Sequence, residues 1–250
     1  MSLLFDLFNK FPVATTDPET ISMGGNGVYS AEEWARVREA TDSLFLKPTE
    51  VNYRRSTYPE LSKLSSAYNL CQLYDFTQFK RLGDIGGCPF YQATVIFDLN
   101  PHLDGLLSDL DRASCELLKV LPRFENYRII AFDVKSEDLS AFDSCDVLTM
   151  WAVDYALDDV DIIQVFKYVN ANSKTLLLAS IECEGLSLVI RNLIPYVVVT
   201  TAKRLLGREY KTRMHGMLRT ERYFKRLAEI SDAKIRTVLS DGKYRIFEVS

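Results

Sequence analysis

The sequence predicts an α/β protein with a doubly wound, mostly parallel seven-stranded sheet, an antiparallel hairpin at its end and an N-terminal helical extension. One observation is that short β-rich runs alternate with helical ones after residue 78, as in right-handed βαβ units. A second is the hairpin signal within residues 234–249, where Asp241-Gly242 joins two β-rich runs and tolerates positive φ. A nicotinamide-type sheet would instead need a further crossover helix there.

The N-terminal part of the chain has a helical and loop-like pattern. Ser30 and Glu33 form an N-cap with a capping-box carboxylate, which predicts a helix over residues 30–46. A second helix is expected near Tyr58, because Pro59 suits a first helical turn. Apolar residues then recur at helical spacing: Leu61, Leu64, Tyr68 and Cys71.

The rest of the chain supplies the sheet and its helices. Parallel strands are expected at residues 79–84, 93–98, 127–133, 146–151 and 175–181, and the hairpin strands at 234–239 and 244–249. Helices are expected at residues 101–121, 158–171 and 220–230. The chain therefore divides into a helical extension over residues 1–76, expected to act as a lid, and a core over residues 77–250.

The composition is that of an ordinary globular protein. The 250 residues are 47% hydrophobic and 26% charged, which excludes collagen-like, low-complexity and largely disordered chains. The formal net charge of -4 argues against binding of polyanions over the whole surface. Five cysteines without a C-x-x-C pair, and only two histidines, support neither a disulfide framework nor a metal site. A reducing cytoplasm is the expected setting.

Two segments bear on secretion and membranes. The N-terminal apolar run contains Asp6 and has no basic region before it, so we expect no secretory signal. Residues 186–206 are rich in apolar side chains, but Arg191 and Pro195 interrupt them, so we expect no transmembrane helix. The preferred interpretation is a helix packed on the core with a solvated basic end. The alternative is peripheral contact of residues 186–213 with the inner face of a membrane.

Four segments occur in an order that is typical of one family. The first, residues 81–90, reads Arg-Leu-Gly-Asp-Ile-Gly-Gly-Cys-Pro-Phe and forms a glycine-rich turn after a predicted strand. The others are Val95-Ile-Phe-Asp98, Ala131-Phe-Asp133-Val134 and the segment 145–155. Together with the terminal hairpin, they resemble the class I S-adenosylmethionine-dependent methyltransferases over residues 79–250. The resemblance implies a Rossmann-like methyltransferase core.

The resemblance also implies a cofactor, S-adenosylmethionine, and a set of residues around it. Asp84 takes the acidic position of the glycine-rich turn. Gly86 and Gly87 would let the backbone come within reach of the ligand, because a side chain there would occupy the ligand's place. Asp98, at the end of the second predicted strand, is expected to hydrogen-bond the ribose hydroxyls.

The adenine and the acceptor are expected at the next two segments. Asp133, beside Val134, would accept a hydrogen bond from the adenine amino group, and Trp151 would lie where the chain faces both cofactor and acceptor. Two features depart from the family pattern. Cys88 and Phe90 stand where the family carries further glycines. The first crossover helix also has room for little more than one turn.

The shortened crossover leaves two alternatives open, because the N-terminus of that helix normally contributes to the cofactor site. One is a catalytically degenerate protein of the same fold that acts as a scaffold or binds a partner. The other is a nucleic-acid or cap methyltransferase, for which the abbreviated glycine turn is suggestive.

Methyl transfer to a hydroxyl requires an aligned acceptor and a general base. His215 is the preferred base, because its segment follows the fifth strand at the carboxyl edge of the sheet, where acceptors bind in this family. Asp154 and Tyr155 are alternatives for the base or for orienting the acceptor. Tyr155, Arg213 and Arg219 are expected to contact the acceptor.

Charge is unevenly distributed along the chain. Residues 98–161 hold fifteen acidic residues against five basic ones, whereas residues 200–226 hold nine basic residues against two acidic ones. The basic segment lies where an acceptor would enter, which favours an anionic small molecule, a glycan or an anionic membrane surface. Residues 213–220 are similar to bacterial surface-polysaccharide methyltransferases, which suggests lipopolysaccharide biosynthesis. A solvated helical face is the alternative, and nucleic acid fits less well because few aromatic residues are interleaved.

Overall fold

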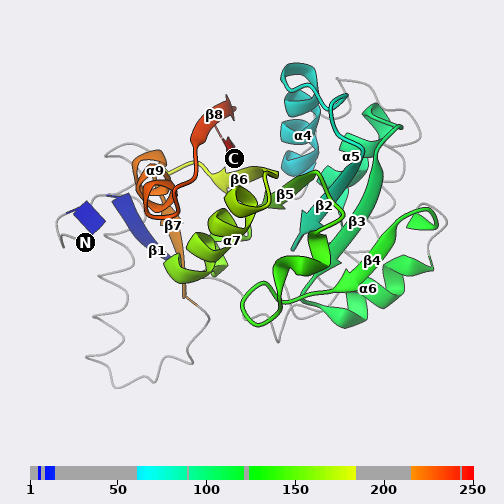
Figure 1. The fold of residues 1–250 in the computed structure, drawn as a ribbon, viewed down its shortest axis with the longest axis horizontal. Helices are drawn as coiled ribbons and strands as arrows, with labels where there is room; N and C mark the ends of the chain where they lie inside the picture. The colour runs from blue at the N-terminus through cyan, green and yellow to red at the C-terminus, as the bar shows by residue number, and fades with distance from the viewer. Residues whose placement is uncertain are drawn as a thin grey trace.

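The computed structural model describes residues 5–6, 9–14, 61–88, 90–120, 124–183, 215–242 and 244–250 (Figure 1). These residues form a seven-stranded sheet with helices on both faces and a separate two-stranded sheet. The predicted helix over residues 30–46, the apolar segment 186–206 and Arg213 lie outside the described residues. Within the part of the chain that is described, no helix combines the length and apolar character needed to cross a membrane.

The seven-stranded sheet has the order β4–β3–β2–β5–β6–β9–β8. Its strands are β2 (Arg81–Ile85), β3 (Asp104–Asp109), β4 (Arg128–Ala131), β5 (Val147–Trp151), β6 (Thr175–Ile181), β8 (Ile235–Ser240) and β9 (Tyr244–Val249). The first five pair in parallel, whereas β9 runs antiparallel between β6 and β8. The predicted fold class, a mostly parallel sheet that ends in an antiparallel hairpin, is confirmed.

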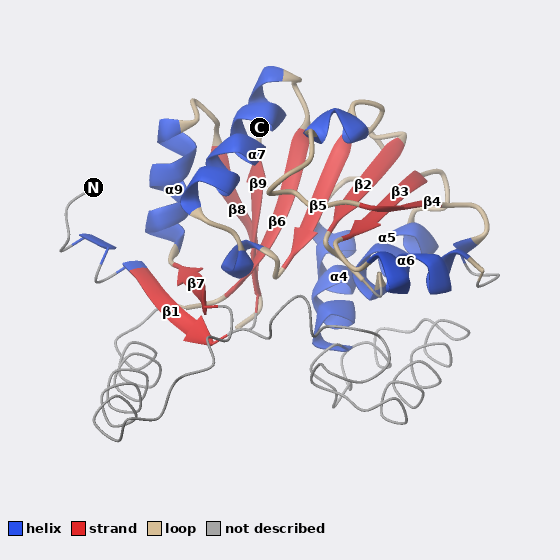
Figure 2. Cartoon of the chain, turned by 90° about the horizontal axis from the view of Figure 1, so that it is seen from below, coloured by secondary structure: helices blue, strands red, loops and turns tan. Residues whose placement is uncertain are grey.

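Helices cover both faces of this sheet (Figure 2). One face carries α4 (Leu61–Leu73), α5 (Tyr91–Leu99) and α6 (Arg112–Lys119), and the other carries α7 (Asp159–Ala171) and α9 (Glu221–Ile230). Two short 3₁₀ turns, η3 (Leu139–Phe142) and η4 (Asp154–Ala156), lie in the loops before and after β5. The predicted helices near residue 58, at 158–171 and at 220–230 are confirmed by α4, α7 and α9.

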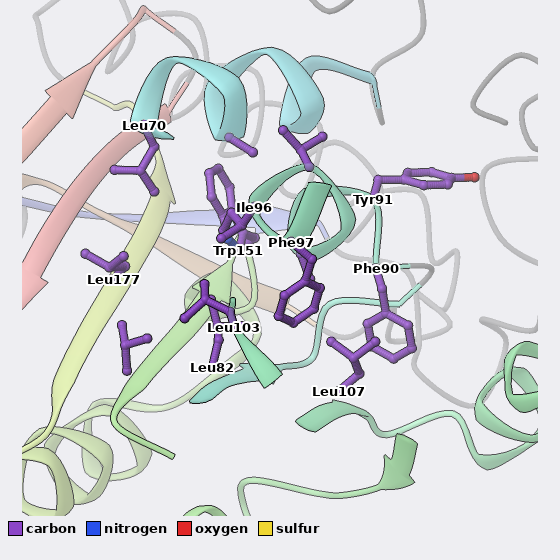
Figure 3. Close-up of a cluster of buried hydrophobic side chains, with 14 of the residues drawn as sticks. Leu70, Leu82, Phe90, Tyr91, Ile96, Phe97, Leu103, Leu107, Trp151 and Leu177 are labelled. Atoms are coloured by element: carbon purple, nitrogen blue, oxygen red, sulfur yellow. The ribbon is translucent and has the colours of Figure 1, made fainter. Parts of the chain in front are cut away.

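The apolar core beneath α4 and α5 holds these helices on the sheet (Figure 3). Leu70 of α4, Phe97 of α5 and Trp151 of β5 belong to one buried cluster. Each large apolar side chain contributes about 1.5–3 kcal/mol when it is fully buried. Trp151 is 0% exposed, so its side chain fills the core.

The predicted strand over residues 93–98 is wrong, because these residues form helix α5. Every residue of α5 from Tyr91 to Phe97 is buried, including the polar Gln92 and Thr94, so neither strand nor helix periodicity marks one face of the segment. The second strand is β3, which lies within the stretch 101–121 that was expected to be one helix. Because α5 spans nine residues, the first crossover helix is not truncated.

The chain start forms a strand that the sequence did not reveal. Strand β1 (Lys10–Ala14) pairs antiparallel with β7 (His215–Arg219), and Figure 2 shows both strands beside α9. Their partners lie about 200 residues apart in sequence, so no local pattern signals the pairing. The expectation of a purely helical and loop-like N-terminal part is therefore wrong for residues 10–14.

Candidate functional site

A pocket of about 210 Å³ opens at the carboxyl edge of the sheet. It lies beside the point where the strand order reverses, because β3 and β4 extend to one side of β2 and β5 and β6 to the other. Ligands of open α/β sheets bind at such points. The lining residues end or follow β2, β3, β4 and β5: Ile85, Gly86, Leu110, Phe132, Asp133, Val134, Lys135, Val153, Ala156 and Leu157.

The glycine-rich turn forms one wall of this pocket. Gly86 has a φ of +69°, and a Cβ atom there would lie 2.7 Å from Cγ2 of Val153. The amide groups of Gly86 and Gly87 both donate to the carbonyl of Ser108, at 2.9 and 3.3 Å, which fixes the turn onto β3. Only glycine combines this conformation with so close an approach to the opposite wall.

The side chain of Asp84 packs against the glycine-rich turn. Its side chain is fully buried and accepts hydrogen bonds from Thr149 Oγ1 at 2.6 Å and Gln92 Nε2 at 3.1 Å. A Cβ atom on Gly87 would lie 1.7 Å from Asp84 Oδ2, so Gly87 is required by this packing. The predicted residues Asp84 and Gly87 therefore lie beside the pocket without being among the residues that line it.

Phe90, which was predicted to depart from the glycine-rich pattern, has a backbone conformation that favours glycine. Its φ is +66°, which is uncommon for a residue with a side chain. Its ring is fully buried and contacts the ring of Phe124 edge to face, with 6.0 Å between centroids. Burial of the ring compensates for the backbone strain, so the turn keeps its shape without the glycine.

Asp109, which the sequence reasoning missed, ends strand β3 at the pocket edge. Its Oδ2 accepts from the Cys88 amide at 3.0 Å and its Oδ1 from the Asp111 amide at 2.9 Å, so it joins the glycine-rich turn to the next loop. Asp98, predicted for the corresponding position, lies instead on α5, whose chain runs back from the carboxyl edge of the sheet. The available signal was the run Gly-Leu-Leu-Ser before Asp109.

Asp133 and Val134, the residues predicted to hold the adenine, both line the pocket. The carboxylate of Asp133 accepts from the Lys135 amide at 2.9 Å and from Ser136 Oγ at 2.9 Å. These bonds fold the loop after β4 on itself and place Val134 toward the pocket. Trp151, in contrast, is a core residue and is not among the lining residues.

Asp154 lies in η4, directly after the pocket residue Val153. Its carboxyl group is fully buried, and its Oδ2 accepts a hydrogen bond from Ser180 Oγ at 2.7 Å. Its Oδ1 has no hydrogen-bond partner among the described residues. Burial raises the pKa of Asp154 to about 6, against the opposing effects of the Ser180 hydrogen bond and the positive charge of Arg219.

Two further predicted site residues, Tyr155 and His215, lie in η4 and in the strand β7 that contacts it. Burial, and secondarily the charge of Asp154, raise the pKa of Tyr155, which packs against Cys183 and Leu218. His215 begins β7, where its backbone pairs with Ala14. Strand β7 itself lies against η4.

Arg219 was predicted to contact the acceptor, but its side chain lies inside the protein. It ends strand β7, and its side chain is 0% exposed. The guanidinium donates to the carboxylate of Asp159 and to three backbone carbonyl groups: those of Asp154, Leu157 and Met217. All three guanidinium nitrogens therefore donate to protein groups, and the side chain has no exposed surface to offer an acceptor.

No family model and no curated protein matches this sequence. Solved structures do match the fold. The mitomycin 7-O-methyltransferase MmcR aligns with a TM-score of 0.56 at 18% identity, over 86% of this chain and 66% of that chain. Human N-acetylserotonin methyltransferase in complex with S-adenosylmethionine aligns with a TM-score of 0.52 at 12% identity, over 85% of this chain and 59% of that chain.

An O-methyltransferase family 2 protein from Planctomyces limnophilus, in complex with apigenin, aligns with a TM-score of 0.54 at 12% identity, over 85% of this chain and 61% of that chain. This chain therefore shares the fold of S-adenosylmethionine-dependent O-methyltransferases, and it spans 59 to 66% of the length of these three proteins.

Proposed function

We propose that this protein is an S-adenosylmethionine-dependent methyltransferase that acts on a hydroxyl group of a small molecule. The observation that carries the proposal is the pocket at the strand reversal, built by the glycine-rich turn at Gly86 and the loop after β4 at Asp133. The similarity in fold to O-methyltransferases supports the same reaction class. The argument for a degenerate scaffold is weakened, because α5 has a normal length.

The residues of this pocket fit the nucleoside part of the cofactor. Leu110, Phe132 and Val134 offer an apolar surface to a flat adenine ring, and Lys135 and Asp133 offer polar groups at its rim. Asp109 lies at the end of β3, where its carboxylate oxygens could accept from ribose hydroxyls. When bound, the cofactor would supply the methyl group, whereas the protein would orient the acceptor and hold its proton.

Asp154 is our preferred group for receiving the acceptor's proton. Its free Oδ1 and its pKa of about 6 are the properties of a general base that works near neutral pH. His215 stays the alternative, because its strand lies against the same turn. Tyr155, which follows Asp154 in η4 and packs against Leu218 of β7, is proposed to orient the acceptor.

The acceptor class is proposed by analogy with the similar structures. MmcR is named for a mitomycin and the Planctomyces protein is in complex with apigenin, which are both small molecules. The narrower prediction of an anionic or glycan acceptor loses Arg219, whose guanidinium points into the protein. The prediction of an anionic or glycan acceptor now depends on the basic residues between 203 and 213. The proposal of peripheral membrane contact depends on the same residues. A reducing cytoplasm remains the predicted location.

Calorimetry with S-adenosylmethionine and S-adenosylhomocysteine tests the proposal. We expect both to bind the wild-type protein, and Asp109→Asn to weaken binding by about tenfold or more, because hydrogen bonds to a charged group contribute about 1.5–3 kcal/mol. Asp104→Asn is the matched control: Asp104 begins the same strand and pairs with Arg81 Nε at 2.7 Å on the surface. A folded wild-type protein that binds neither compound at millimolar concentration would refute the function.

A further inference from the structure

We infer that Arg219 is a positioning residue that holds the η4 turn, and with it one wall of the pocket, in its ligand-binding conformation. The inference rests on the proposed function and assigns this role to a side chain that touches neither ligand. It starts from the contacts of the guanidinium. Nη1 donates to the carbonyl of Asp154 at 2.7 Å and Nη2 donates to the carbonyl of Leu157 at 2.7 Å.

These two carbonyl groups belong to the first residue of η4 and to the residue that follows it. The turn between them is short and has only two internal backbone hydrogen bonds, from Ala156 to Val153 at 2.9 Å and from Leu157 to Asp154 at 3.2 Å. The guanidinium thus connects both ends of a weakly bonded turn. Val153, Ala156 and Leu157 of this turn all line the pocket, and Asp154 carries the proposed base.

Asp159, in the first turn of α7, orients the guanidinium. Its Oδ1 accepts from Arg219 Nε at 2.9 Å and lies 2.8 Å from Nη2. Its Oδ2 accepts from Lys10 Nζ at 2.7 Å and from the Tyr223 hydroxyl at 2.8 Å. Burial opposes ionisation of Asp159, but these hydrogen bonds and the charge of Arg219 outweigh it and lower its pKa.

The carboxylate of Asp159 therefore joins four elements: β1 through Lys10, β7 through Arg219, α9 through Tyr223 and its own helix α7. A buried cation with this many partners is held in one orientation. Lysine has the charge but not the planar fork, so it cannot bond both carbonyl groups and Asp159 in the same way. The geometry points to the planar guanidinium group, and not to its positive charge alone, as the feature that positions the turn.

The test uses full-length Arg219→Lys and Asp159→Asn variants, with Arg236→Lys as the matched control. Arg236 also pairs through Nε and Nη2 with a carboxylate, that of Glu248, but on the exposed hairpin. Calorimetry with S-adenosylhomocysteine is run at a temperature where circular dichroism shows each protein folded. If the turn holds its binding conformation about a tenth of the time, the apparent Kd rises about tenfold.

We expect that rise for Arg219→Lys, a similar or smaller rise for Asp159→Asn and no change for Arg236→Lys. Variants that melt at a lower temperature but bind with the wild-type Kd when folded would overturn the inference, because Arg219 would then only stabilise the fold. If Arg219→Lys does not fold, Asp159→Asn alone decides in the same way.

Hydrogen exchange of the amides of residues 153–157 provides a readout that needs no ligand. We expect faster exchange there in Arg219→Lys and Asp159→Asn, with wild-type exchange in Arg236→Lys. Unchanged exchange in both variants would refute the inference that Arg219 holds the η4 turn. A different result separates the two proposals. If the wild-type protein does not bind S-adenosylhomocysteine but exchange is faster in the variants, the proposed function is refuted, whereas the role of Arg219 in holding the turn stands.

Discussion

The carboxyl group of Asp154 is shielded from water by the protein, and this burial raises its pKa to about 6. The Ser180 hydrogen bond and the charge of Arg219 favour the ionised form but do not outweigh burial. A carboxyl group in an unfolded chain has a pKa of about 3.9. Folding therefore makes Asp154 easier to protonate.

This shift predicts a specific pH dependence of stability. Because the pKa is higher in the folded state, Asp154 stabilises the fold at low pH, and the contribution is lost as the pH rises towards and past about 6. Between pH 7 and pH 5 the wild-type protein should gain about 1 kcal/mol of unfolding free energy relative to Asp154→Asn. Urea denaturation at both pH values measures it. An identical pH dependence of the unfolding free energy in the two proteins would contradict the raised pKa of Asp154.

Residues of the site differ in how readily a sequence reveals them. The sequence singled out Gly86, Asp133 and Val134, which line the pocket, because a glycine turn and a strand-ending carboxylate are local signals. Asp109 was missed because an error in one strand displaced the acidic position from β3 to Asp98. Arg219 was misassigned because its partners Asp154 and Asp159 lie some sixty residues away.

Helix α9 illustrates how an element is anchored at its start. Thr220 is its N-cap: the hydroxyl accepts from the Tyr223 amide at 3.3 Å and donates to Asn9 Oδ1 at 2.8 Å. The Thr220 amide also donates to the carbonyl of Asn9 at 3.0 Å. Thr220 therefore caps the helix and also bonds Asn9, the residue that precedes β1.

Removing this hydroxyl should destabilise the protein. We expect Thr220→Ala to lower the unfolding free energy by about 1–2 kcal/mol, because both the cap and the bond to Asn9 are lost. Thr220→Ser keeps the hydroxyl and should unfold near the wild-type urea midpoint. Equal midpoints for the alanine variant and the wild type would show that the cap is not needed here.

At the level of elements, prediction worked where the pattern was periodic or bounded by turns. Strand β6 matches its predicted range, and α7 differs from its prediction by one residue at its start. It failed at α5, where burial of every residue from Tyr91 to Phe97 removes the contrast between faces that periodicity depends on. It also failed at β1, whose pairing with β7 is made entirely by distant residues.

For the molecule as a whole, a bound ligand should stabilise the folded state by mass action. S-adenosylhomocysteine at about a hundred times its Kd should add about 2.7 kcal/mol, which corresponds to a rise in Tm of about 5–10 °C for a chain of this size. Differential scanning calorimetry measures this rise. NAD at the same concentration is the control and should leave the Tm unchanged. A rise with NAD alone would indicate a different dinucleotide site.

The division of the chain at residue 76 remains a prediction, since residues 15–60 lie outside the described residues. Two described parts of the N-terminal region nevertheless contact the core. Helix α4 packs against α5 and shares its buried cluster, and β1 pairs with β7. Any movement of a lid would therefore have to leave these two contacts in place.

The fold class, the positions of most strands along the chain and the glycine-rich turn could be predicted from the sequence, because these depend on local turn chemistry and on repeated patterns of apolar residues. The packed structure was needed to show that Ala93 to Asp98 lie in a helix, that Asp109 bonds the glycine-rich turn and that Arg219 bonds the carbonyl of Leu157 in the pocket wall. The physical reason is the same in each case. Burial and hydrogen bonding to partners far along the chain outweigh local preference.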